Sequence, residues 1–169
     1  MKYIFLFCTF FAINAFAQKD IKPSATFTVS GLVQTELTFH IGDEGKYKQD
    51  SLGDVAIKNH QGDTKYVAKK IKGILLKTFI DSAGIHVDKP KEYSELYVVL
   101  TATDGYKNVY SYNELSNSEI GEHIYVLTGE DGKNMSQMDN RIEVMSLGDY
   151  NSGRRHLRAL VKIEVKKVD

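Results

Sequence analysis

The stretch "SGRRHLRALVKIEV", from Ser152 to Val165, joins a basic cluster to a regular apolar alternation. Successive side chains of a β-strand point to opposite faces, so this alternation is typical of a strand with one face in a core. The predicted apolar face consists of Leu157, Ala159, Val161, Ile163 and Val165. The predicted opposite face consists of His156, Arg158, Leu160, Lys162 and Glu164. The stretch therefore predicts a strand that lies against a hydrophobic core.

The basic cluster consists of Arg154, Arg155, His156 and Arg158, and the turn Asn151-Ser152-Gly153 leads into it. Guanidinium groups, together with the backbone N–H groups of such a turn, suit a phosphate or a carboxylate. The alternative is a solvated strand end whose arginines extend into water, because short basic clusters are common on protein surfaces. The residues alone leave both interpretations open.

Composition indicates a single globular domain. The chain has 169 residues, 42% of them hydrophobic and 26% charged, which is enough for a sizeable core. The 22 basic side chains balance the 22 acidic ones, whereas a nucleic-acid-binding protein normally carries a clear basic excess. We find no internal repeat and no long linker, so residues 18–169 are predicted to form one domain that does not bind nucleic acid.

The N-terminal residues 1–17, "MKYIFLFCTFFAINAFA", have the pattern of a signal peptide. Lys2 precedes an apolar run that is short for a bilayer span, and Ala15-Phe16-Ala17 forms a small-x-small cleavage site. We predict cleavage after Ala17 and a periplasmic or secreted protein; the alternative is an uncleaved N-terminal anchor. Cys8 is the single cysteine, so the mature chain is predicted to have no disulfide, no thiolate metal ligand and no cysteine nucleophile.

The remaining elements predict an α+β, β-dominated fold with a mixed sheet and one main helix at about residues 73–84. In that helix an apolar stripe is formed by Leu76, Phe79, Ile80 and Ala83, and Gly84 is placed to end it. Residues 42–54 are polar and contain glycine, so they predict a loop, and residues 113–119 predict a short helix. Strands are predicted at 25–33, 35–41, 55–60, 64–72, 95–103, 106–112, 122–128, 141–147 and 158–165.

Few other residues indicate chemistry. Tyr106, Tyr110 and Tyr112 follow the turn Asp104-Gly105, and such rings can stack on a flat heterocycle or cover the core. The five histidines show no metal-ligand spacing, and no phosphate-binding or catalytic serine motif is present in the sequence. No catalytic residue and no metal ligand are therefore predicted.

Four segments, in this order, resemble the sulfite-oxidase-type molybdopterin-binding domain family. They are "FTVSGLVQTELTFHI", "KGILLKTFIDSAGI", "YVVLTATDGYKNVYSYNEL" and "RIEVMSLGDYNSGRRHLRALVKIEV". The last contains the family element G-x-R-H-[VL]-[KR]-x-[LI], matched by Gly153, Arg155, His156, Leu157, Arg158 and Leu160. The resemblance covers nearly the whole mature chain and implies a sulfite-oxidase-like fold.

The resemblance also implies a set of ligand-binding residues. In the family this element helps to hold the pyranopterin and its phosphate, which implies that Arg155, His156 and Arg158 bind a ligand. Arg141 matches a further pocket arginine, although its spacing to Gly153 is longer here. The residues implied at the pocket rim are Asp104, Gly105 and Tyr106.

The sequence departs from the family at the molybdenum ligand. Catalytic members supply a cysteine upstream of the main helix, but the corresponding region "AIKNHQGDTKYVAKKIKG" has none. His60 lies near the expected place and is a candidate ligand-binding residue, yet an imidazole does not replace a soft thiolate. The expected cofactor is thus a pterin or molybdopterin, and the missing thiolate argues against molybdenum.

Three functions remain as hypotheses. The preferred one is an exported protein that binds a pterin or similar anionic ligand without redox catalysis and acts with a membrane-bound receptor or redox partner. The second is a divergent molybdopterin-dependent oxidoreductase or a subunit of one. The third is an interaction domain whose arginines are solvated.

Overall fold

Two β-sheets and a short helix enclose the main core in the computed structural model, which describes residues 20–168. The predicted signal peptide, residues 1–17, lies outside this range. Across residues 20–168, every helix is too short or too polar to cross a membrane. The α+β, β-dominated class predicted from the sequence is confirmed.

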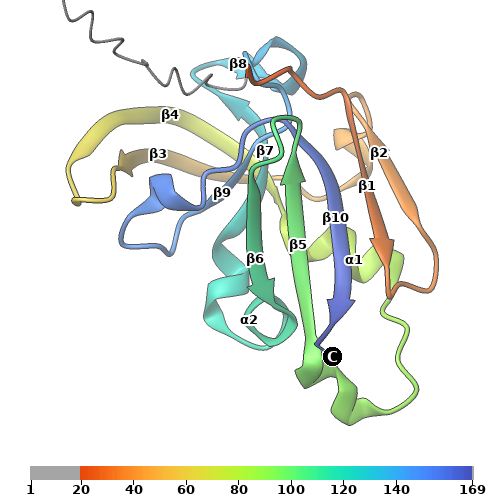
Figure 1. Ribbon diagram of the computed structural model, residues 1–169. Coiled ribbons are helices and arrows are strands. Elements are labelled where there is room, and N and C mark those ends of the chain that lie inside the picture. Colours follow the sequence, from red (N-terminus) through yellow and green to blue (C-terminus); the bar gives the residue numbers. More distant parts are fainter. Residues whose placement is uncertain (1–19, 169) are drawn as a thin grey trace, which may run out of the picture.

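The first sheet has its C-terminal strand at the centre (Figure 1). Its order is β2 (Leu37–His40), β1 (Thr26–Gly31), β10 (Leu160–Lys167), β5 (Leu96–Ala102) and β6 (Lys107–Ser111). Strand β1 runs parallel to β10, whereas the other neighbours are antiparallel, so the sheet is mixed as predicted. Strand β6 forms one edge, and β2 forms the other.

The second sheet is antiparallel and includes a long hairpin. Its order is β3 (Asp50–Lys58), β4 (Thr64–Leu75), β7 (Ile124–Glu130) and β8 (Lys133–Asn134), with β9 (Val144–Ser146) also pairing with β7. Strand β4 pairs with β7 only from Lys72 to Leu75. The outer part of the β3–β4 hairpin therefore extends past β7, as Figure 1 shows.

The main helix α1 (Leu76–Ala83) buries the predicted stripe of Leu76, Phe79, Ile80 and Ala83. It begins at Leu76 and not at about residue 73, because Gly73 to Leu75 continue β4 and pair with β7. Gly84 ends the helix at φ 67°, and its N–H group donates to the carbonyl groups of Ile80 and Asp81. The other helices are α2 (Tyr112–Ser116) and the 3-10 turns η1 (Glu44–Lys46), η2 (Pro90–Glu95), η3 (Glu119–His123), η4 (Met135–Gln137) and η5 (Ser152–Arg154).

An aromatic cluster joins helix α1 to the first sheet. The ring of Phe27 lies 4.9 Å from that of Phe39 and 5.0 Å from that of Phe79. All three side chains are fully buried. A smaller apolar cluster lies under the hairpin and contains Ile57, Ala68, Ile71, Tyr125, Leu127, Met138 and Met145. The hairpin thus has its own small core beside the main one.

The predicted alternation from residue 157 to residue 165 is wrong at Leu160, which is buried although the alternation places it on the opposite face, and at Val161, which is only partly buried. The reason is a bulge: the pairing of β10 with β5 shifts between Leu160 and Lys162. Immediately before it, Ala159 has a left-handed backbone at φ 55° and is buried. A bulge re-aims neighbouring side chains, and Arg158 accordingly lies outside the strand and is exposed.

Two further predicted boundaries are wrong. Residues 42–54 are not wholly a loop, because η1 lies within them and β3 begins at Asp50, where irregular pairing around Gly53 hides the strand pattern. The strand predicted at 141–147 is shorter, because Arg141 has φ 61° and ordered pairing covers only Val144–Ser146.

Gly31 provides a test of the pairing between β1 and β10. It has φ 92°, and a Cβ atom there would lie 2.2 Å from the Val165 carbonyl oxygen. We expect Gly31→Ala to lower the free energy of unfolding by about 2–3 kcal/mol, because backbone strain and a backbone clash add. Urea unfolding measures this. The control is Gly45→Ala, where a Cβ atom meets nothing within 4 Å. Equal changes in the free energy of unfolding for the two variants would contradict the close approach of Gly31 to Val165.

Candidate functional site

A cavity of about 410 Å³ lies where the hairpin, the β5–β6 turn and the segment before β10 meet. Its lining residues are Ile21, Ile57, Lys65, Tyr66, Asp104, Tyr106, Gly153, His156 and Arg158. Of the predicted ligand-binding residues, the structure brings Asp104, Tyr106, His156 and Arg158 to this cavity. Lys65 and Tyr66 precede Gly153 by more than 80 residues, so segments distant in the chain form one site.

The turn η5 is anchored on strand β3. The hydroxyl of Ser152 accepts a hydrogen bond from the Lys58 N–H group and donates one to the Ala56 carbonyl oxygen, both at 3.2 Å. A Cβ atom on Gly153 would lie 2.5 Å from the Lys58 carbonyl oxygen, so glycine permits this close approach. These contacts place the segment that carries His156 and Arg158 beside the hairpin.

The β5–β6 turn positions Tyr106 at the cavity. The Asp104 carboxylate accepts a hydrogen bond from the Tyr106 N–H group at 2.8 Å, and Gly105 between them has φ 86°. The Tyr106 hydroxyl donates to the Arg154 carbonyl oxygen at 2.6 Å. Although 46% exposed, the tyrosine is therefore fixed at both its backbone and its hydroxyl. Gly105 shapes the turn and does not line the cavity.

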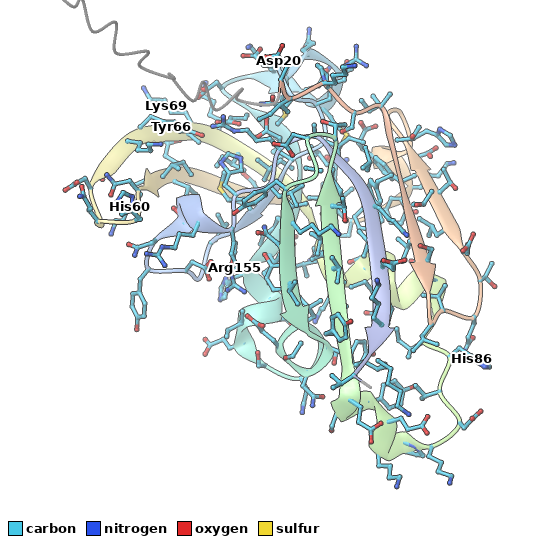
Figure 2. The ribbon with its side chains drawn as sticks, in the orientation of Figure 1. Asp20, His60, Tyr66, Lys69, His86 and Arg155 are labelled. Carbon is cyan, nitrogen blue, oxygen red and sulfur yellow. The ribbon has the colours of Figure 1, made fainter. Side chains whose placement is uncertain are left out.

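Arg155 points to a different place from His156 and Arg158. Its Nε and Nη2 atoms donate to the two carboxylate oxygens of Asp149, with the Nε bond at 2.6 Å, and its Nη1 atom donates to Glu114 in α2 at 2.7 Å. The guanidinium also lies 4.6 Å from the centre of the Tyr110 ring. Figure 2 shows Arg155 beside β6 and α2.

Hydrogen bonding to Asp149 raises the pKa of the Arg155 guanidinium above its ordinary value, with Glu114 adding to the effect. Bidentate pairing of this kind holds a guanidinium in a fixed plane. Arg155 does not line the cavity and connects the C-terminal segment to α2. Its predicted role in binding a ligand stays a prediction.

His60 and Arg141 also lie outside the cavity lining. His60 is exposed in the turn between β3 and β4, where its carbonyl oxygen faces the Asn151 amide at 3.5 Å (Figure 2). Arg141 lies between η4 and β9, and its N–H group donates to the Met138 carbonyl oxygen at 3.1 Å. The ligand-binding roles assigned to these two residues likewise remain predictions.

Sequence analysis missed the hairpin wall of the cavity. Lys65 and Tyr66 on β4 line it, and Tyr66 is 37% exposed. Burial raises the pKa of the Tyr66 hydroxyl, and the charge of Glu130 raises it further. All four residues from Thr64 to Val67 are exposed, so no apolar period marks which of them turn toward a site. Only the folded hairpin brings them to the segment before β10.

Sequence analysis also missed Glu143. Its carboxylate lies 2.6 Å from Nε2 of His156, and the two side chains are only 6% and 5% exposed. Glu143 lines a second cavity of about 220 Å³, which shares Tyr66 and Arg158 with the first. Burial raises the pKa of Glu130 in that second cavity, and the charge of Glu143 adds to the shift. The buried Glu143–His156 pair thus separates the two cavities.

The cavity combines two cationic side chains with aromatic rings. Lys65 and Arg158 form no ion pair with a carboxylate within residues 20–168, so their charge is available to an anion. Tyr66 and Tyr106 add apolar ring faces, on which a flat ligand can stack. In the same part of the chain, no group of three or more histidine, cysteine or acidic side chains is placed to hold a metal ion.

No protein-family model and no curated protein matches this chain. Among solved structures, it matches the sulfane dehydrogenase SoxCD from Paracoccus pantotrophus with a TM-score of 0.61 at 11% sequence identity. The fold is similar to part of that enzyme. The match covers 85% of this chain and 39% of the other, so this chain spans about two fifths of the matched protein's length. At this identity the match shows the fold alone.

Comparison of the two neighbouring arginines tests the structural role of Arg155. We expect Arg155→Met to lower the free energy of unfolding by about 2 kcal/mol, because Asp149 and Glu114 lose their shared, half-buried cation. Arg154→Met is the control, because Arg154 is exposed and forms no ion pair in the described part of the chain; we expect a change below about 0.5 kcal/mol. Urea unfolding of both variants measures the difference, and equal values would contradict this role.

Proposed function

We propose that this protein binds a small anionic ligand with a flat ring, of the pterin type, and that it does so without redox catalysis. The observation that carries the proposal is the cavity in which Lys65 and Arg158 lie with Tyr66 and Tyr106. The cations would bind a phosphate or carboxylate, and the tyrosine rings would contact the heterocycle.

The size of the cavity supports a ligand of this class. Ligand pockets commonly enclose about 300–1,000 Å³. At about 410 Å³ the cavity falls near the small end of that range. It suits a bicyclic heterocycle with a short phosphorylated side chain better than a dinucleotide.

The residues present fit a pterin but do not fit a thiolate-ligated molybdenum centre. Cys8 is the single cysteine of the sequence and belongs to the predicted signal peptide, so the mature chain would offer no thiolate ligand. A sulfite-oxidase-like assignment of the fold, which the ordered segments imply, is part of this proposal. The match to a sulfane dehydrogenase supports it at the level of the fold.

The predicted export belongs to the same proposal. A periplasmic or secreted binding protein would deliver its signal to a membrane-bound receptor or redox partner. The signal-peptide pattern of residues 1–17 and the absence of cysteine after Cys8 motivate the location, because a cysteine-free chain needs no reducing compartment.

A second candidate is a divergent molybdopterin-dependent oxidoreductase or a subunit of one, favoured by the similarity to a named dehydrogenase. Metal analysis of protein purified from its native host separates the candidates. Molybdenum near one atom per chain would support the oxidoreductase, and a content far below that, from cells supplied with molybdate, would reject it.

Titration calorimetry with neopterin monophosphate tests the preferred function. We expect saturable binding, and we expect Arg158→Gln to weaken it by about tenfold, because a charge-assisted hydrogen bond to the phosphate is lost. Arg154→Gln is the matched control, because that exposed side chain does not line the cavity. Absence of binding by the folded protein, or equal losses in both variants, would overturn the assignment of the cavity.

A further inference from the structure

The buried Glu143–His156 pair has a geometry that determines how His156 meets a ligand. Nε2 of His156 lies 2.6 Å from the Oε2 atom of Glu143. The other carboxylate oxygen accepts a hydrogen bond from the Asn140 side-chain amide at 3.1 Å. Both oxygens therefore have a partner, and an ionised carboxylate can only accept.

A carboxylate acceptor fixes the histidine tautomer. When Glu143 accepts from Nε2, the proton of a neutral imidazole lies on Nε2, and Nδ1 keeps its lone pair. Nδ1 forms no hydrogen bond within residues 20–168. The buried polar atoms without a partner there are the hydroxyl oxygens of Ser24, Ser30, Tyr110, Thr128 and Ser146, so Nδ1 is not among them and reaches the accessible surface.

His156 borders the main cavity, whereas Glu143 borders only the second one. The imidazole of His156 is therefore the part of the pair that borders the main cavity. Asp104 contributes a further acceptor to the lining, since one of its carboxylate oxygens is free of the hydrogen bond to Tyr106. The site thus offers acceptors as well as the cations Lys65 and Arg158.

We propose that Glu143 is a positioning residue that holds His156 in the Nε2–H tautomer, so that Nδ1 accepts a hydrogen bond from an exocyclic amino group of the ligand. This inference rests on the proposed function and narrows its ligand class. The ligand would carry an amino-substituted heterocycle in addition to its anionic group. Glu143 itself touches no ligand.

Glu143→Gln reverses this polarity with little change in volume. The Asn140 amide donates to the Oε1 position, so the glutamine oxygen is retained there and its NH₂ group takes the Oε2 position. That NH₂ group donates to Nε2, which moves the imidazole proton to Nδ1. The cavity end of His156 then changes from an acceptor to a donor.

Nitrogen NMR of the His156 imidazole identifies its tautomer in the absence of any ligand. We would compare spectra in which both ring-nitrogen shifts identify a neutral imidazole, because only the neutral ring has a tautomer. We expect a protonated Nε2 in the wild type and a protonated Nδ1 in Glu143→Gln. Glu130→Gln is the matched control, because it removes a neighbouring carboxylate that does not contact Nε2 of His156. This variant should keep the wild-type tautomer.

The other charged groups near the Glu143–His156 pair are Arg158, Asp131, Lys133 and Asp139, and all of them are unchanged in both variants.

Comparing the binding of pterin with that of lumazine tests the proposed hydrogen bond between the exocyclic amino group of the ligand and Nδ1 of His156. Lumazine has an oxo group where pterin has its exocyclic amino group. We expect the wild type and Glu130→Gln to prefer pterin by about tenfold, and we expect Glu143→Gln to lose or reverse that preference, because a donor then faces a donor. Thermal unfolding and circular dichroism establish that each variant is folded.

The outcomes are distinguishable. Nδ1–H in the wild type, or the same tautomer in Glu143→Gln, would overturn the positioning role. A switched tautomer with an unchanged ligand preference would overturn the contact with the amino group. If the folded wild type binds neither neopterin monophosphate nor these two heterocycles, the proposed function fails, and the NMR result still decides the role of Glu143.

Discussion

The central place of β10 in the first sheet is the constraint on which the rest of the structure depends. The last strand of the chain pairs with β1 on one side and with β5 on the other. Its backbone approaches Gly31 so closely that a side chain there would clash with Val165. Because β10 must reach this position, the segment before it crosses the end of the second sheet, where η5 hydrogen-bonds to β3. The same constraint that completes the sheet therefore builds the cavity.

The path of that segment gives its three arginines different environments. Arg154 is exposed, and its carbonyl oxygen fixes Tyr106. Arg155 is paired with Asp149 and Glu114. Arg158 lies in the cavity wall, because the left-handed backbone of Ala159 and the bulge that follows turn Arg158 out of the strand. A basic cluster that is uniform in sequence thus contains a solvated residue, a structural ion pair and a cation that forms no ion pair within residues 20–168.

Local patterns predicted much of the fold but only part of the site. The stripe of α1 follows from the apolar period of residues 76–83, and the structure confirms it. Leu160 was misassigned because a bulge changes the two-residue period without a marker in the sequence. Asp149, Glu114 and Glu143 lie 6, 41 and 13 residues from their basic partners, so no local spacing identified those pairs. Lys65 and Tyr66 were missed because an exposed ribbon has no apolar period.

The two walls of the cavity differ in how firmly the fold holds them. His156 is buried against Glu143, and the turn that carries Tyr106 follows β5, an interior strand of the first sheet. Lys65 and Tyr66, in contrast, lie where β4 pairs only with β3, and a two-stranded ribbon is marginally stable alone. Its support comes from the small apolar cluster around Ile57 and from the contacts of Ser152 and Gly153. A ligand that contacts both walls would bind only the docked hairpin, so binding and hairpin order must be linked through the same free energy.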